Sequence, residues 1–416
     1  MALTREKLSP STIMEGVRKL LLVDIVLKDE DNAQLVFETV NSTGRPLTDI
    51  QKIQNYILMT VSCNEQEELY NSCWLPMKKQ LENDFDAFLK YYLTAHLEKQ
   101  TYGGYYDTFK DFIRLSGKTT KEVVENIKKF SGYYDKWKNA GRSKDSLDVK
   151  IADIKETGQW TFAPVILRIL DDLNSQKCTY TQAIDILSIM ESYITRRMLL
   201  DLPTKTGNKV CIAMLKALDK GDYVGGFVNC IYSLTWAQRM PSDEELYVSL
   251  KTVPLYRNNP KGSRRILDRM ESYINKDYSH NSNHSIEHIM PQTIESEEDL
   301  YARTDLTAKE KEERDWAGDL GADWKTVHDT YCNTIGNLTL TGYNPNYQNC
   351  RFLVKRDKQD KENGICYGYK QTCIHLSASL ATKEKWGEEE ILERAKEMTD
   401  IIISIWPYPK KATEQS

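Results

Sequence analysis

The sequence lacks the features of several protein classes. Its longest apolar stretches, residues 20–27 and 162–170, are far shorter than the about 20 residues that span a bilayer, so no membrane helix is expected. The N-terminal segment has no signal-peptide core, and the nine cysteines contain no C-x-x-C pair. With only 12 prolines and 20 glycines in 416 residues and no short repeat, a collagen-like, solenoid or disordered chain is excluded. We therefore expect a folded cytoplasmic protein with reduced thiols.

Charge is nearly balanced overall but unevenly distributed. The net charge is −5, from 56 basic and 61 acidic residues. Residues 251–276 carry seven basic and two acidic side chains, and residues 351–370 carry six and three. Between them, residues 291–330 carry twelve acidic and five basic side chains. Two basic segments could hold phosphates, although solvated helix faces give the same pattern.

Hydrophobic periodicity predicts a mainly α fold of two or three domains. Residues 20–27 suggest a buried strand, residues 31–40 a helix, and Thr48 an N-cap. From there to about residue 253 the apolar spacing is helical, with breaks at Gly and Pro positions that include Gly225-Gly226. This stretch is expected to be a helical scaffold.

The pattern changes after residue 278. Residues 285–290 predict a short strand that ends at Pro291, and residues 338–341 alternate as a second strand. An acidic helical insert lies between them, and a basic helix follows Pro345. The order describes a small ββα unit. A further helix is expected from about residue 388 to 405, before a loose tail.

Glu287 and His288 are the residues most suited to chemistry. A carboxylate binds a hard cation such as Mg²⁺, and an imidazole can take a proton from water. Neighbours on a strand point to opposite faces, so both serve one site only where the strand ends, as Pro291 predicts. His280, His284 and His288 would share one helix face as zinc ligands, but the Asn- and Ser-rich segment between them favours a loop.

Several motifs together resemble one family. EHIMPQT, then IGNLTLTGYN, then the N-x-x-F-x-x-K of Asn349, Phe352 and Lys355 resemble the C-terminal nuclease domain of GmrSD-type modification-dependent (type IV) restriction enzymes, a His-Me finger of the HNH type. NAQLVFETVNSTGRPLTDIQKIQNYILM (residues 32–59) resembles the end of the N-terminal half of those proteins. SYITRRMLLDLPT (residues 192–204) resembles their linking helical region.

This resemblance implies a set of site residues. His288 would be the general base, Glu287 a metal ligand, and Asn337 would hold the His-bearing strand and orient the imidazole. Asn344 is the first choice for a second ligand of Mg²⁺ or Mn²⁺, with Asn346 or Asn349 as alternatives. Further candidates are Lys355, expected to face the phosphate, the DNA-contacting residues Arg351, Arg264 and Arg265, and His328, which is left outside the catalytic set.

The resemblance is incomplete at the N-terminal side. The family's DGQQR nucleotide-hydrolysis motif does not occur in the sequence, so we expect preceding sequence or a split partner to supply that sensor half. The expected divisions are residues 1–60 as the tail of that half, 61–255 as a helical linking domain, 256–406 as the nuclease domain and 407–416 as a loose tail.

The implied function is a metal-dependent DNA endonuclease or nickase in an anti-phage restriction system, acting on DNA that includes modified phage DNA. The alternative is a non-catalytic helical scaffold that binds DNA or a nucleotide-hydrolysing sensor partner.

Overall fold

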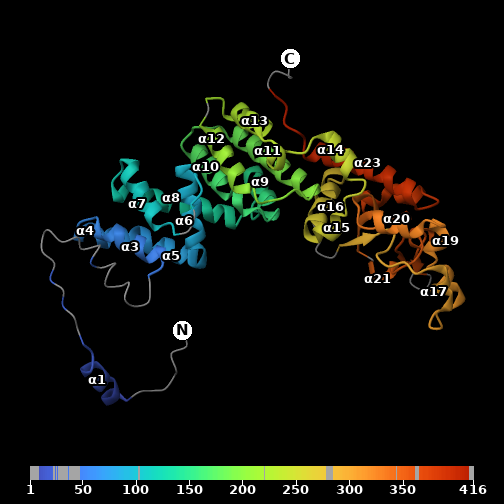
Figure 1. The fold of residues 1–416 in the computed structure, drawn as a ribbon, viewed down its shortest axis with the longest axis horizontal. Coiled ribbons are helices and arrows are strands. Elements are labelled where there is room, and N and C mark those ends of the chain that lie inside the picture. The colour runs from blue at the N-terminus through green and yellow to red at the C-terminus, as the bar shows by residue number, and fades with distance from the viewer. Residues whose placement is uncertain are drawn as a thin grey trace.

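The computed structural model describes residues 9–21, 24, 26, 36, 47–101, 104–219, 221–277, 284–342, 344–360 and 365–411. It is 68% helix and 3% strand, which confirms the mainly α prediction. Figure 1 shows an elongated molecule in which α3 to α13 form one part and α14 to α23 continue beyond it. Within the described residues, no helix is both long and apolar enough to cross a membrane.

The first part is built from helices that cover one large hydrophobic core, from Ile53 to Met240. Thr48 caps α3 in a capping box with Gln51, as its sequence position predicts. The helices are α3 (Asp49–Met59), α4 (Cys63–Leu69), α5 (Leu75–Leu81), α6 (Phe85–Leu97), α7 (Tyr106–Ser116), α8 (Thr120–Lys138), α9 (Ser146–Glu156), α10 (Ala163–Asn174), α11 (Tyr180–Leu199), α12 (Gly207–Leu218) and α13 (Tyr223–Ser233), preceded by the separate α1 (Pro10–Arg18).

The second part holds two strands among shorter helices. β1 (Ser285–His288) pairs antiparallel with β2 (Leu338–Thr341), with His288 opposite Leu338. A second hairpin joins β3 (Gln359–Asp360) and β4 (Ile365–Cys366). The helices are α14 (Asp243–Ser249), α15 (Leu255–Asn258), α16 (Pro260–Ile274), α17 (Glu297–Ala302), α18 (Ala308–Glu312), α19 (Trp316–Leu320), α20 (Trp324–Tyr331), α21 (Asn344–Tyr347), α22 (Phe352–Arg356) and α23 (Glu388–Ile405).

The strand pair lies between two hydrophobic cores. Leu338 and Leu340 of β2 belong to one core, with α16 and α23. Ile289 and Met290, just after β1, belong to the other. The turn before β2 is pressed against α23, because a Cβ on Gly336 would lie 2.3 Å from the carbonyl oxygen of Ile391. Glycine is therefore required at this position.

A buried ionic cluster joins the two parts. Glu191 of α11 accepts from Arg265 Nη2 of α16 at 3.0 Å and from Lys150 Nζ of α9 at 3.0 Å. The indole of Trp406 donates to the same Glu191 carboxylate at 2.9 Å. α16 is thereby tied to the helical part through Arg265, while the adjacent Arg264 donates to the carbonyl oxygen of His284, the residue before β1.

Four local predictions were wrong. A buried strand was predicted at residues 20–27, but the described residues Leu20, Leu21 and Val26 are exposed and lie outside any strand. A helix break was predicted at Gly225-Gly226, but α13 runs through both residues. The amide of Gly225 donates to Oδ1 of the N-cap residue Asp222 at 2.9 Å. The basic helix after Pro345 is short, since α22 ends at Arg356 and β3 follows.

The last of the four concerns the segment predicted as a loose tail. Tyr408 packs edge to face on Tyr232, with ring centroids 5.4 Å apart. Tyr232 also donates a hydrogen bond to the carbonyl oxygen of Pro409. Residues 407–411 thus lie against α13, because the aromatic side chain finds an apolar surface there. The predicted helix at residues 31–40 lies almost wholly outside the described residues.

Candidate active site around the end of β1

β1 ends at His288, two residues before the predicted end of the strand, and its two candidate residues point to different surroundings. Glu287 lies opposite Thr339 and His288 opposite Leu338 in the antiparallel register. Successive side chains on a strand alternate between faces. Accordingly, Glu287 contacts Lys355 of α22, whereas His288 packs on Tyr256 of α15. The strand end does not bring both side chains onto one face.

The imidazole of His288 is nearly enclosed, with 8% of the residue exposed. The ring of Tyr256 meets it edge to face, with centroids 4.5 Å apart and planes at 90°. Burial lowers the pKa of His288 to about 4, although a hydrogen bond between the ring and the side chain of Asn333, which favours the charged imidazole, opposes the shift. The imidazole is therefore neutral at pH 7. Its Nε2 is buried and has no hydrogen-bond partner within the described structure.

Glu287 is held by Lys355 in a buried ion pair. Lys355 Nζ lies 2.6 Å from Glu287 Oε1, and it also donates to the carbonyl oxygens of His288 at 2.9 Å and Ile289 at 3.0 Å. Glu287 is 3% exposed and Lys355 is 0% exposed. Burial raises the pKa of Glu287 and lowers that of Lys355, while their mutual attraction opposes both shifts.

Asn337 fastens the chain just beyond His288. Its Nδ2 donates to the carbonyl oxygens of Met290 and Cys332, both at 2.8 Å. Its Oδ1 accepts from the amide of Met290 at 2.8 Å and from the indole of Trp386 at 3.0 Å. Asn337 thus lies where it can hold the segment that follows β1.

Asn344, at the start of α21, lies beside β1. Its Nδ2 donates to the carbonyl oxygen of Ile286 at 3.0 Å, which leaves Oδ1 as the acceptor end of the amide. Asn349 is exposed in the turn after α21. The side chain of Asn346 lies outside the described part of the structure.

The basic candidates are largely committed to protein partners. Lys355 does not face a phosphate in this structure, because its ammonium is enclosed by the three oxygens of the β1 end. Arg265, which was predicted as a DNA contact, is 8% exposed and pairs with Glu191. Arg264 pairs with Asp268 and Arg351 with Asp319, both at partly exposed positions.

His328 lies close to this region without joining the candidate set. Its Nε2 is 2.9 Å from the carbonyl oxygen of Pro291, so the ring contacts the turn that follows β1. This position agrees with its omission from the catalytic residues, whose assignment stays a prediction.

Sequence reasoning missed two neighbours of His288. Asn333 opens the same NTIGNLT segment as Asn337, so its place in the motif offered a signal. Its carbonyl oxygen also accepts from the amide of Tyr256 at 3.2 Å, which joins the two neighbours to each other. Tyr256 lies 32 positions before His288 in sequence, and no local pattern marks it.

The strand pair and the short helices α21 and α22 that follow β2 define a small ββα unit in a mainly helical protein. Residues 240–401, which contain all of this unit, match the family described as GmrSD restriction endonucleases, C-terminal domain. The resemblance inferred from EHIMPQT and IGNLTLTGYN is therefore confirmed for this part of the chain. No curated protein matches the chain. The match supports a restriction nuclease, a class of enzyme whose substrate is DNA.

Proposed function

We propose that residues 240–401 hydrolyse phosphodiester bonds in DNA with His288 as the general base. The observation that carries this proposal is the His288 imidazole itself, which is neutral at pH 7 and has an Nε2 without a protein partner. A neutral nitrogen with a free lone pair can take a proton from water. The water oxygen then bonds to phosphorus, the P–O ester bond breaks, and a second water molecule protonates the leaving oxygen.

The neighbours of His288 would act as positioning residues. Tyr256 packs against the ring, and the Asn333 side chain hydrogen-bonds to it. Asn337 fixes the backbone two residues later through Met290. An imidazole that its neighbours hold in one rotamer loses little entropy when it is aligned on the substrate, which supports positioning roles for these residues.

A divalent metal, Mg²⁺ or Mn²⁺, belongs to the proposal, but the side chains as arranged do not complete a site for it. The Glu287 carboxylate is already neutralised by Lys355. Among the residues that the structure describes, no three His, Cys, Asp or Glu side chains cluster as metal ligands. Asn344 Oδ1 is the neutral oxygen that remains beside β1. The metal requirement is therefore a separate prediction, tested by omitting the cation.

The biological setting is a further part of the proposal. We infer action on modified phage DNA together with a nucleotide-hydrolysing sensor half, with nicking or double-strand cleavage as the outcome. The support is the family match at residues 240–401 and the motif resemblances at residues 32–59 and 192–204. The same support favours residues 61–255 as a linking domain.

A second candidate function is a non-catalytic scaffold that binds DNA or the sensor partner. The enclosed His288 and the Lys355–Glu287 pair favour it, because a substrate phosphate would have to displace protein atoms to reach either residue. Under this alternative, the ββα unit stabilises the fold and has no turnover.

Nicking of supercoiled plasmid tests the proposal. Wild-type protein is incubated with unmodified and phage-modified DNA in Mg²⁺, in Mn²⁺ and in excess chelator, beside His288→Ala. His375→Ala is the matched control, because His375 is an exposed imidazole in the same part of the chain. We expect cleavage in metal, a loss of about 10²-fold or more in His288→Ala, and wild-type rates in His375→Ala. Equal rates in wild type and His288→Ala would exclude His288 as the base. If the wild type cuts neither DNA, the scaffold function is favoured.

A further inference from the structure

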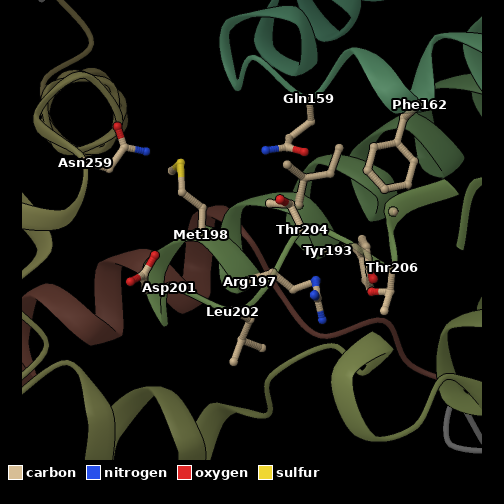
Figure 2. A pocket seen from close by; sticks show the side chains of 12 residues that line it. Gln159, Phe162, Tyr193, Arg197, Met198, Asp201, Leu202, Thr204, Thr206 and Asn259 are labelled. Carbon is tan, nitrogen blue, oxygen red and sulfur yellow. The ribbon is translucent and has the colours of Figure 1, made fainter.

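Two hollows share the short 3-10 turn η3 (Trp160–Phe162) and the start of α12. Figure 2 shows the first, where Phe162 and Arg197 belong to the wall. The guanidinium of Arg197 already donates to the carbonyl oxygens of Arg239 and Pro203, so it is committed to the protein. The second hollow lies against other residues of η3 and α12 and has a volume of about 300 Å³. Its wall is less committed.

The wall of the second hollow combines aromatic and neutral polar side chains. It is formed by α6, by residues 100–101 that follow this helix, and by η3, α10 and α12. Among the residues that the structure describes, no aspartate or glutamate lines it, and its one charged side chain is Lys90. Such a wall suits a planar, polar and uncharged group better than it suits a cation.

Trp160 presents an aromatic ring to this hollow. The residue is 39% exposed, and its ring packs on that of Trp137, with centroids 5.4 Å apart and planes at 77°. Trp137 is 0% exposed, so the indole of Trp160 rests on a buried neighbour that limits its movement. A held and partly exposed indole is a surface on which a planar base can stack, and every base has a π-face for such a contact.

Hydrogen-bonding groups surround this ring. Gln100 and Asn208 each bring an amide, which has two donors and an acceptor oxygen, and Thr94 and Thr101 bring hydroxyls. Within the part of the chain that the structure describes, none of these four side chains forms a hydrogen bond to the protein. The edge of a nucleobase carries the same mixture of donors and acceptors, so these groups match it.

Two lysines add positive charge to the surroundings. Lys90 belongs to the wall, and its Nζ lies 5.4 Å from the centroid of the Tyr105 ring. Lys209 directly follows Asn208 in the sequence and is exposed. Neither lysine forms an ion pair with a carboxylate of the described residues. A DNA strand that places a base in the hollow brings phosphates beside it, and these charges favour them.

We propose that this hollow accepts one unpaired nucleobase of a DNA strand. The base stacks on Trp160, Gln100 and Asn208 hydrogen-bond to its edge, and Lys90 contacts an adjacent phosphate. A volume of about 300 Å³ holds one base and is too small for a base pair. The proposal rests on DNA being the substrate of the nuclease part. It adds a DNA contact on the helical part, outside the residues 240–401 that match the family.

Binding of a short, fluorescein-labelled single strand of DNA to the full chain tests the proposal. The titration is made in excess chelator, which keeps metal-dependent cleavage out of the measurement, and fluorescence anisotropy gives the affinity. Trp160→Ala should weaken binding about 10-fold or more, because it removes the stacking ring, and Trp160→Phe should recover most of the loss. Trp236→Ala is the matched control and should bind as the wild type does, because Trp236 is 88% exposed and lies outside the wall.

Two variants of exposed polar residues separate base contact from a loss of packing in Trp160→Ala. Asn208→Ala removes an amide that has no partner in the described protein, so the Tm should stay unchanged while the affinity falls about 5-fold. Its salt dependence should equal that of the wild type. Lys90→Gln should instead reduce the slope of log K against log salt by about 0.7, the share of one phosphate contact on a single strand.

Photocrosslinking locates the bound base, and competition identifies its source. A strand with one iodouracil, irradiated on the protein and mapped by mass spectrometry, should label the peptide that contains Trp160 or the peptide that contains Tyr91, which also lines the hollow. A free mononucleotide should compete only weakly, because it lacks the neighbouring phosphates of a strand. His288→Ala should bind the strand as the wild type does, since His288 is not in the wall, so a failure of the cleavage proposal leaves this result unchanged.

Four results would overturn the proposal. The first is a wild type that does not bind the strand, and the second is wild-type affinity in both Trp160→Ala and Asn208→Ala. The third is a crosslink confined to peptides outside the wall. The fourth is a mononucleotide that competes as well as the strand, which would assign the hollow to a free nucleotide.

Discussion

Lys355 and Glu287 form a buried ion pair in which the ammonium of α22 also caps two carbonyl oxygens at the end of β1. The pair explains why a lysine and a glutamate 68 positions apart belong to one motif. The pair also gives Glu287 a counter-charge that comes from the protein itself. A metal that used Glu287 would have to compete with Lys355.

Removal of one member of this pair should be more harmful than removal of both. We expect Lys355→Met to lower the free energy of unfolding by about 3–5 kcal/mol, because it leaves Glu287 buried and unpaired. The double variant Lys355→Met with Glu287→Gln should recover more than half of that loss. Urea unfolding of the two single variants and the double variant gives the coupling energy. Lys385→Met, at an exposed pair with Glu389, should have little effect. Additive single and double effects would show that the pair is not coupled.

Asn337 should matter for both stability and cleavage. Asn337→Ala leaves the buried groups of Met290, Cys332 and Trp386 without their partner, so we expect a loss of about 3 kcal/mol. Plasmid nicking should fall at temperatures where the variant is still folded, because the segment after His288 is released. Asn349→Ala, in an exposed turn, is the matched comparison and should leave the Tm unchanged. A wild-type Tm for Asn337→Ala would contradict the role that its hydrogen bonds indicate.

Asp153 should make stability depend on acid pH. Burial and the nearby Glu191 raise the pKa of Asp153 to about 6, although Arg269, Lys150 and Arg265 oppose the shift. The folded state therefore binds more protons than the unfolded state between about pH 4 and pH 6. The contribution of Asp153 to the free energy of unfolding falls by up to about 3 kcal/mol as the pH rises through that window. Urea unfolding of wild type and Asp153→Asn across this range measures it. Parallel curves for the two proteins would show that the carboxyl group does not have a raised pKa.

Arg257 and Arg265 should differ in their effect on DNA affinity. Arg265 is buried against Glu191, so Arg265→Gln should lower the Tm and leave the salt dependence of DNA binding unchanged. Arg257 is exposed on α15, directly after the Tyr256 that packs on His288. Arg257→Gln should weaken binding and reduce the slope of log K against log salt by about 1. Binding curves at several salt concentrations test both. A lower slope in Arg265→Gln alone would support the DNA contact that the sequence predicts for Arg265.

The sequence predicted local structure where the deciding interactions lie close together in the chain. Thr48 caps α3 through Gln51, only three positions later. The apolar spacing of residues 388–405 gives α23 at the predicted positions, and β1 begins at Ser285 as predicted, although it ends at His288 before Pro291. The mainly α class follows from such local patterns, because helix periodicity and capping are read within a few residues.

Side-chain roles depended on contacts that the sequence does not encode locally. Lys355 and Arg265 were predicted to contact DNA, and the structure pairs them with Glu287 and Glu191, which lie 68 and 74 positions away in the sequence. Likewise, the ring of Tyr256 in α15 meets that of His288, which lies 32 positions later in the sequence. Whether a charge faces solvent or a buried partner is decided by packing, which brings distant segments together and sets the local dielectric.

The sequence by itself therefore determined the helical class, the ββα order and the motif of the nuclease family. The tertiary structure decided which of the motif's polar groups are free. His288 keeps an unpartnered nitrogen, whereas Glu287 and Lys355 satisfy each other, because burial favours the pairing of opposite charges and leaves the neutral imidazole without need of a counter-ion.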